Sequence, residues 1–137
     1  MTKLRIYTAS KLRHADLWRT LSVEWPEFDW VSRWPFDHCG NIPDSDTFAR
    51  WFWMQDIEDV ARCDVLVVLA TETDHLRGAL VEAGAAIALH KTVIVVGEHA
   101  DYGTWQWHQS VRRVKDMDDL RVTLNLLAKH GVSGFRT

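Results

Sequence analysis

A single carboxylate within an otherwise apolar segment constrains the fold of this chain most. Residues 78–89 read Gly-Ala-Leu-Val-Glu-Ala-Gly-Ala-Ala-Ile-Ala-Leu, and Glu82 is their only polar side chain. The segment lies between two apolar runs, 65–70 and 93–96. This pattern predicts a strand, a helix and a strand, with the helix packed on a parallel sheet. Because burying an unpartnered charge is costly, Glu82 must face solvent, be paired or serve chemistry. We interpret it as a nucleophile at the carboxyl end of the sheet.

Strands and helices are expected to alternate along the whole chain. The expected strands are residues 3–9, 27–33, 64–71, 92–97 and 111–115. One helix is expected to end near residue 23, and a second to run from a cap at Ser45 or Asp46 to about residue 62. Two more helices are expected over residues 78–90 and 118–130, the last with Gly131 as its C-cap. Residues 36–45 and 101–108 show no helical or strand periodicity of apolar side chains and are expected to be irregular.

This alternation predicts one α/β domain over residues 1–137. The expected architecture is a three-layer sandwich around a Rossmann/flavodoxin-like, mainly parallel sheet of five strands. Ligands of such sheets bind outside the carboxyl ends of the strands, near the switch in strand order.

Composition narrows the classes of partner. The net charge of −3 gives no electrostatic footprint for a nucleic acid polymer. No apolar stretch reaches the ~20 residues that span a bilayer, and the N-terminus does not resemble a signal peptide. A cytoplasmic location is therefore expected. Cys39 and Cys63 have no metal-ligand spacing, and the seven histidines form no HxxxH pair. We expect neither a metal nor another cofactor.

Three side chains are candidates for catalysis: Tyr7 near the end of the first strand, Glu82, and Asp56 on the helix before the third strand. Two carboxylates and a tyrosine that converge on a sheet edge suit cleavage of a glycosidic bond, because one group attacks while another handles the proton of the leaving group. Each residue also has a structural interpretation. Tyr7 could lie at the edge of the core, Asp56 could pair with an arginine, and Glu82 could face solvent.

The position of Asp56 follows from helical spacing. Trp53, Ile57 and Val60 form one apolar stripe, and Asp56 lies three residues after Trp53 and four before Val60. Asp56 is therefore expected to share the inward face of its helix. The charged residues that follow it are expected to point elsewhere: Glu58, Asp59 and Arg62.

The loop Ser10-Lys11-Leu12-Arg13 follows the first strand and precedes a helix. A hydroxyl, cationic side chains and the backbone N–H groups of a helix start suit a phosphate group. The loop is no Walker motif, and a solvated surface is its simpler interpretation.

The chain has eight tryptophans, a high number for its length. The runs Trp51-Phe52-Trp53 and Trp105-Gln106-Trp107 cannot all face one core, since adjacent side chains diverge on a helix or strand. Some are expected to stack on a ligand base or to form a subunit contact, and the subunit contact is the simpler interpretation.

The sequence resembles the nucleoside 2-deoxyribosyltransferase-like family, which includes the 2′-deoxynucleoside 5′-phosphate N-hydrolases. The matching residues are, in chain order, Ile6-Tyr7-Thr8-Ala9-Ser10, Ser32-Arg33-Trp34, Asp56 ahead of Asp64-Val65-Leu66-Val67-Val68, Arg77-Gly78-Ala79-Leu80-Val81-Glu82-Ala83-Gly84-Ala85-Ala86 and Lys91-Thr92-Val93-Ile94-Val95-Val96-Gly97-Glu98. The most specific part is the Glu-x-Gly-x-Ala segment after an Asp-led apolar strand.

The resemblance implies a role for each matched residue. The motif glutamate of the family attacks C1′ of the sugar and forms a covalent glycosyl–enzyme intermediate, and Glu82 matches it. Tyr7 matches the tyrosine that orients this glutamate. Asp56 matches the aspartate that contacts the leaving base or the sugar. Ser10 and Arg13 occupy the region that holds the 5′-phosphate in the monophosphate hydrolases.

The segment before the motif differs from those hydrolases. Thr73-Asp74-His75-Leu76-Arg77-Gly78 is longer and bulkier than their serine or small residues. Here Asp74 or His75 is expected to contact the sugar and Arg77 to supply a cation. Further substrate contacts are expected from Gly78, Trp34 and Trp53.

The resulting expectation is an enzyme that cleaves the N-glycosidic bond of a (deoxy)nucleoside 5′-monophosphate or nucleoside, without a cofactor and as a homodimer or higher homo-oligomer. Base exchange between deoxynucleosides is the nearest alternative, because the same residues serve both reactions. A non-catalytic nucleotide sensor is a further alternative. A flavodoxin-like redox protein is disfavoured, since no loop rich in Ser, Thr and Gly follows the first strand.

Overall fold

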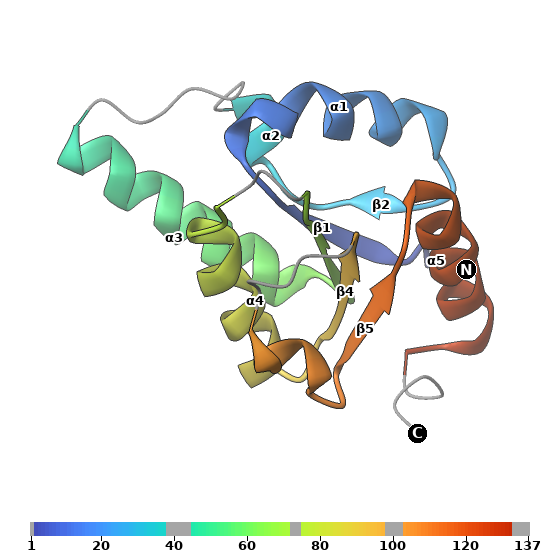
Figure 1. Cartoon of the computed structure of the whole chain (residues 1–137). Helices are drawn as coiled ribbons and strands as arrows, with labels where there is room; N and C mark the ends of the chain where they lie inside the picture. Colours follow the sequence, from blue (N-terminus) through green and yellow to red (C-terminus); the bar gives the residue numbers. More distant parts are fainter. Residues whose placement is uncertain (1, 38–44, 72–74, 98–102, 133–137) are drawn as a thin grey trace.

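Figure 1 shows the computed structural model of the chain, which describes residues 2–37, 45–71, 75–97 and 103–132. Its strands are β1 (Arg5–Ala9), β2 (Asp29–Trp30), β3 (Val65–Leu69), β4 (Thr92–Val96) and β5 (Val111–Val114). Its helices are α1 (Ala15–Glu24), α2 (Trp34–Asp37), α3 (Asp46–Arg62), α4 (Gly78–Ala88) and α5 (Met117–His130), with short 3-10 turns η1 (Leu12–His14) and η3 (Thr104–Trp107).

The strands form one sheet in the order β2-β1-β3-β4-β5, and every neighbouring pair is parallel. Helices α3 and α4 cover one face, and α1 and α5 lie on the other (Figure 1). The expected three-layer α/β fold is confirmed, with a sheet that is parallel throughout. The strand order reverses between β1 and β3, so the carboxyl ends of these two strands mark the place where ligands of such sheets bind.

The centre of the sheet forms because two apolar runs are buried on both faces. Every residue of β3 and β4 is buried. Continuous Val, Ile and Leu segments of this kind are typical of central parallel strands. Each such side chain that is fully buried contributes roughly 1.5–3 kcal/mol relative to exposure, so these strands form a rigid support for the side chains at their ends.

The second strand lies within residues 27–33 as expected, but it is shorter than that range. Only Asp29–Trp30 is strand. Beyond it, side chains replace the regular ladder. Thr8 N donates to Ser32 Oγ over 3.2 Å, and Trp34 Nε1 donates to Thr8 O over 2.6 Å. The chain then makes the helical turn α2 where we expected a loop, and the remainder of that loop, residues 38–44, lies outside the described residues.

The ends of the helices follow their capping residues. Ser45 caps α3 by accepting a hydrogen bond from Phe48 N over 3.3 Å. Gly131 ends α5 with φ 81° and donates its N–H to Leu127 O over 2.8 Å. Both caps confirm the prediction. The segment that includes Trp105 contains the short turn η3. None of the described helices is long and apolar enough to cross a membrane.

A glycine after β4 is required for the packing of the strand ends. Gly97 has φ 102°, and a Cβ there would lie 2.2 Å from Ala70 O. We predict that Gly97→Ala lowers the free energy of unfolding by about 2–4 kcal/mol, because strain and a backbone clash add. Urea denaturation measures the change.

Gly84→Ala is the matched control, because no atom lies within 4 Å of the Cβ position on the exposed side of α4. It is expected to stabilise the protein by roughly 0.5–1 kcal/mol, since alanine favours a helix over glycine. Equal effects of the two substitutions would contradict the packing argument.

Candidate active site

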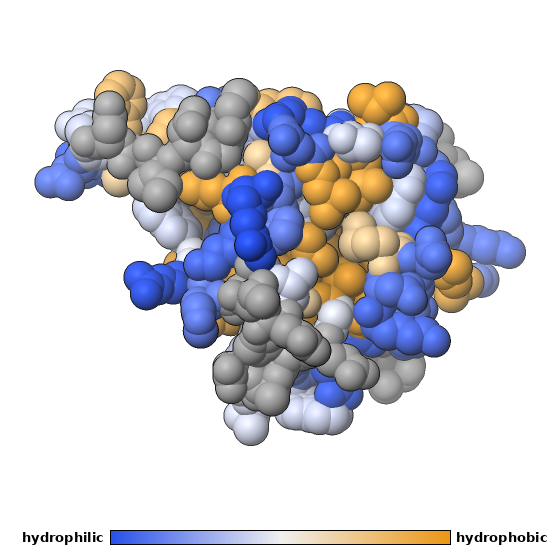
Figure 2. Space-filling view, turned by 45° about the horizontal axis from the view of Figure 1, so that its top comes forward, coloured by the Kyte–Doolittle hydropathy of each residue, from blue (hydrophilic) through white to orange (hydrophobic). Residues whose placement is uncertain are grey.

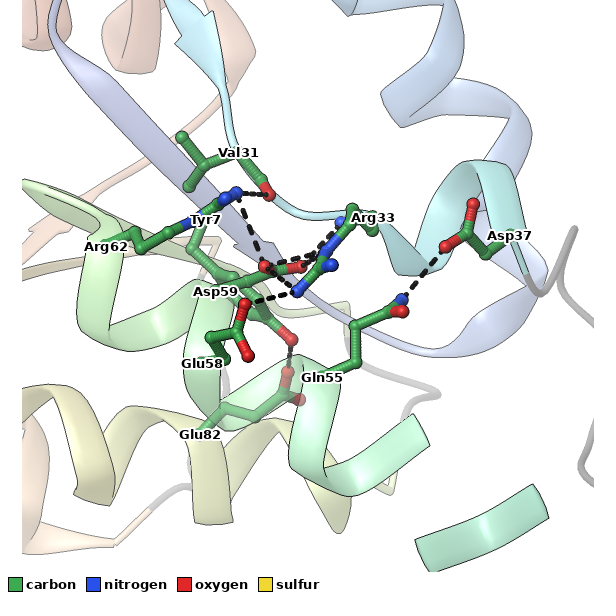
Figure 3. A network of polar contacts seen from close by, with 9 residues as sticks. All are labelled: Tyr7, Val31, Arg33, Asp37, Gln55, Glu58, Asp59, Arg62 and Glu82. Atoms are coloured by element: carbon green, nitrogen blue, oxygen red, sulfur yellow. Dashed lines mark hydrogen bonds and ion pairs between the residues drawn. The ribbon is translucent and has the colours of Figure 1, made fainter. Parts of the chain in front are cut away.

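A buried hydrogen bond joins the first strand to α4. The hydroxyl of Tyr7 donates to Oε2 of Glu82, and their side chains meet between the sheet and the helix (Figure 3). Tyr7 is fully buried on β1, and Glu82 is 7% exposed. Glu82 is thus neither a solvent-facing residue nor part of an ion pair in the described structure. It is a buried carboxyl with a single tyrosine hydrogen bond, next to the strand-order switch.

Small side chains on α4 make this contact geometrically accessible. Ala79, Ala83 and Ala86 are buried on the face of α4 that packs on the sheet. Alanines let a helix axis approach a sheet closely, so that the side chain of Glu82 reaches a hydroxyl on β1. The small apolar residues of the segment 78–89 therefore allow the close approach that the hydrogen bond between Tyr7 and Glu82 requires.

Burial controls the charge of Glu82. It raises the pKa of this carboxyl to about 8, because the ionised form loses its hydration. The carboxyl of the free protein is therefore mostly protonated at neutral pH and becomes ionised as pH rises. Since the Tyr7 hydroxyl is a donor, it stabilises the ionised form in the same position.

Gly78 lies next to both Trp53 and Glu82. A Cβ on Gly78 would be 3.3 Å from two ring carbons of Trp53 and 4.0 Å from Oε1 of Glu82. The absence of a side chain at Gly78 therefore leaves room for the Trp53 ring and for the free carboxyl oxygen. Trp53 is 39% exposed, so its ring borders solvent as well as the site.

Asp56 has an unpartnered carboxyl oxygen. Oδ1 is buried and makes no hydrogen bond to any described residue. Burial, followed by the nearby charge of Asp59, raises the pKa of Asp56 to about 7, while Arg33 opposes the shift. Buried polar atoms nearly always have a partner, so an orphaned oxygen of this kind is suited to a ligand.

The inward face of α3 differs from the expected stripe. Trp53 and Ile57 are 39% and 37% exposed, whereas Gln55, Asp59 and Val60 are buried. The prediction that Asp59 points away from the protein was wrong, because its side chain is completely buried. Its burial is compensated by cations that sequence spacing alone did not pair with it.

Asp59 is held by two arginines (Figure 3). Arg33 donates to Asp59 from its backbone N over 3.0 Å and from Nε over 3.0 Å. Arg62 Nη2 lies 3.4 Å from Asp59 Oδ1 and donates to Val31 O over 3.1 Å. Arg33 also pairs with Glu58 over 3.1 Å. An arginine in the otherwise largely apolar segment 31–34 was the sequence signal for a buried carboxylate partner.

The predicted phosphate loop lies at the carboxyl end of β1. Ser10 Oγ accepts a hydrogen bond from Trp18 Nε1 over 2.8 Å and donates to Lys11 O over 3.1 Å. Its proton is thus already used within the loop. Arg13 is exposed on η1. The loop thus has an exposed arginine and a serine hydroxyl that is held by hydrogen bonds, both just after the carboxyl end of β1.

The remaining predicted residues are more dispersed. Trp34 is 3% exposed and supports β1 through its bond to Thr8, so it presents no open ring face. Arg77 is exposed at the N-cap of α4. Asp74 lies outside the described residues. Among the residues that the structure describes, no cluster of three His, Cys, Asp or Glu side chains could hold a metal ion.

The sequence matches the family model described as nucleoside 2-deoxyribosyltransferase over residues 9–122. The protein belongs to this family. The match includes Asp56 and Glu82 and begins just after Tyr7, whose assignment therefore depends on its hydrogen bond to Glu82. Membership indicates activity of the N-glycosidase or deoxyribosyltransferase class on nucleosides or nucleotides.

The fold is also similar to a solved structure, that of the CMP N-glycosidase BcmB from Clostridium botulinum. The TM-score is 0.55 at 17% identity, and the similarity covers 89% of this chain and 98% of that chain. At this identity the likeness shows the shared fold. A comparison with curated proteins gives no match.

The buried carboxyl at Glu82 should lower stability as pH rises. At a pH below its ordinary pKa of 4.5 the carboxyl is protonated in both the folded and the unfolded state. Between pH 4.5 and about 8, only the folded state keeps the proton. The unfolded state then binds fewer protons, so stability falls over this range. We predict that Glu82→Gln is more stable than the parent by about 2–4 kcal/mol above that range, and equal to it in acid.

Denaturation of both proteins across this pH range measures the difference. Glu58→Gln is the control, because its side chain is 65% exposed and its loss should change stability by no more than about 0.5 kcal/mol at any pH. A Glu82→Gln protein whose stability runs parallel to that of the parent would contradict the burial of a protonated carboxyl.

Proposed function

We propose that the protein cleaves the N-glycosidic bond of a (deoxy)nucleoside 5′-monophosphate or nucleoside and releases the free base. The observation that supports this most is the buried hydrogen bond from Tyr7 to Glu82 beside the strand-order switch. It fixes one carboxyl oxygen of Glu82 and leaves the other, Oε1, on the side of Gly78 and Trp53. A fixed carboxyl with one free oxygen has the form of a nucleophile rather than a structural group.

In the first step the ionised Glu82 attacks C1′ on the face opposite the base. The C1′–Oε1 bond forms as the C1′–N bond breaks, and the bonding electrons pass to the base nitrogen. Positive charge develops on the sugar, so the adjacent carboxylate stabilises the transition state as well as attacking it. The product of this step is a glycosyl ester of Glu82.

Asp56 is assigned to the proton of the leaving base. With its pKa raised to about 7, a substantial fraction carries a proton at neutral pH and can transfer it to the departing base. In the second step Asp56 accepts a proton from water while the water oxygen attacks C1′. The ester bond breaks, Glu82 leaves as a carboxylate and the sugar product is released.

The 5′-phosphate is assigned to Arg13 and the loop that includes Ser10. The loop is at the carboxyl end of β1, and both its 3-10 turn and α1 begin there. The similar fold of BcmB, which is described as a CMP N-glycosidase, supports a nucleoside monophosphate as substrate. A free base in place of water would give base exchange by the same residues, and this is the second candidate function.

We further propose that the protein forms a homo-oligomer. Exposed apolar side chains occur on α3 and α4, among them Phe48 at 54%, Trp51 at 52% and Val81 at 57%. The exposure of Trp51, Trp53 and Trp107 confirms that the tryptophans do not share one core. Figure 2 shows apolar residues between polar ones on one face of the molecule. Apolar and aromatic side chains of this kind are enriched at subunit interfaces.

The reaction can be tested by chromatography of the protein incubated with nucleosides and their 5′-monophosphates, with and without an acceptor base. We expect free base from monophosphates in the absence of acceptor. Glu82→Gln should lower kcat by roughly 10³-fold or more, because no nucleophile remains, while its circular dichroism spectrum is unchanged. Products that form only with acceptor would establish the transferase instead, and full turnover by Glu82→Gln would exclude the mechanism.

The phosphate assignment has a separate test. Arg13→Ala should raise KM for monophosphates roughly 10–100-fold and leave KM for nucleosides unchanged, because a hydrogen bond to a charged group contributes about 1.5–3 kcal/mol. Lys129→Ala removes a charge from an exposed position in the last turn of α5 and serves as the control. An equal rise in KM for both substrate classes would remove the assignment of Arg13 to the phosphate.

A further inference from the structure

A buried carboxylate with two partly exposed arginines lies beside the proposed acid, and the reaction steps above do not use these side chains. Asp59 follows Asp56 by three residues on α3, so the two carboxyls lie on neighbouring positions of one helix face. Asp59 is completely buried, and Arg33 and Arg62 approach it to 2.8 and 3.4 Å. The pairs with these arginines must first offset the cost of taking the Asp59 carboxylate out of water, so the cluster is suited to a purpose besides stability.

The cluster fixes α3 to the segment after β2. Arg33 contacts Asp59 through both its backbone N–H and its guanidinium. Arg62 bridges from Asp59 to the carbonyl of Val31. These bonds join the helix to the segment at two successive points, and Figure 3 shows them on the side of α3 that faces this segment. A helix held at two points cannot rotate about its axis, so the direction of its other side chains is fixed.

We infer that the Arg33–Asp59–Arg62 cluster is a positioning group of the active site, which fixes the direction of Asp56 and, through the opposed charges of Asp59 and Arg33, sets how readily Asp56 holds the proton for the leaving base. This inference rests on the proposed function. Asp59 acts by repulsion, because ionisation of Asp56 would place a negative charge next to the buried carboxylate of Asp59. Arg33 acts in the opposite direction and limits the effect.

The direction of each contribution agrees with this role. Burial and then Asp59 raise the pKa of Asp56, and Arg33 lowers it. Asp37 of α2 is already engaged by Gln55 Nε2 over 3.1 Å. The titratable and charged groups on this part of α3 and on the elements packed against it are Tyr7, Arg33, Glu58, Asp59, Arg62 and Glu82.

The test compares Asp59→Asn with Arg33→Gln. Carbon NMR of isotopically labelled aspartate carboxyls, with Asp56→Asn to assign the signal, follows the ionisation of Asp56 in the absence of substrate. Asp59→Asn should move the Asp56 titration to lower pH, and Arg33→Gln should move it to higher pH. Glu58→Gln, which alters an exposed partner of the same arginine, should leave it in place.

The same variants are then assayed for kcat/KM against pH on the best substrate of the chromatographic panel. Because the pKa of Glu82, about 8, lies above that of Asp56, about 7, the acid limb of this profile reports Asp56, and it should move to lower pH in Asp59→Asn and to higher pH in Arg33→Gln. Each pH unit of displacement changes kcat/KM above the limb about tenfold. If Asp59→Asn does not fold, Arg33→Gln alone decides the question through the direction of its shift.

Opposite shifts in both measurements support the inference. Shifts in the same direction for both variants, or none, would overturn it and leave the cluster a structural anchor. An NMR shift without a matching change in the acid limb would also overturn it, because Asp56 would not then be the acid of the reaction. If no substrate is turned over, the proposed function fails, and the NMR titration still decides whether the cluster sets the ionisation of Asp56.

Discussion

The hydrogen bond between Tyr7 and Glu82 is the interaction around which this site is organised. It requires a tyrosine directed out of β1, a helix close enough to the sheet for a glutamate to reach it, and a cover that excludes water from both. The alanine face of α4 meets the second requirement, and α3 with Trp53 provides part of the cover. The composition of α4, which is unusual for a surface helix, is therefore explained by one polar contact beneath it.

Two carboxyls with raised pKa values lie on neighbouring helices, and the two pKa values are raised by different surroundings. Glu82 is affected by burial alone and has a hydroxyl donor. Asp56 is affected by burial and by another carboxylate, and one of its oxygens has no partner. Environments that tune two acids separately are typical of sites where one group attacks and the other moves a proton.

The success of sequence reasoning followed the local strength of each pattern. Residues 65–70 and 92–97 are apolar without interruption, so their strands and the parallel sheet could be predicted. The bounds of the strand within residues 27–33 could not be predicted, because the bonds beyond β2 come from side chains of Ser32 and Trp34 to β1, and such tertiary contacts have no local signature. Asp59 was misplaced for a related reason: its burial depends on Arg33, which is 26 residues away. Helical spacing placed Val60 on the inward side of α3 correctly, but it also placed Trp53 and Ile57 there and could not account for a distant cation.

The two edges of the sheet have a consequence for how copies of this chain can associate. β2 spans only Asp29–Trp30, and β5 carries the exposed arginines Arg112 and Arg113 at its centre. Short edges and charged edges are poor templates for strand addition. Sheet extension from one molecule to the next is thus disfavoured at both ends, and an association of copies would have to use the helical layers instead.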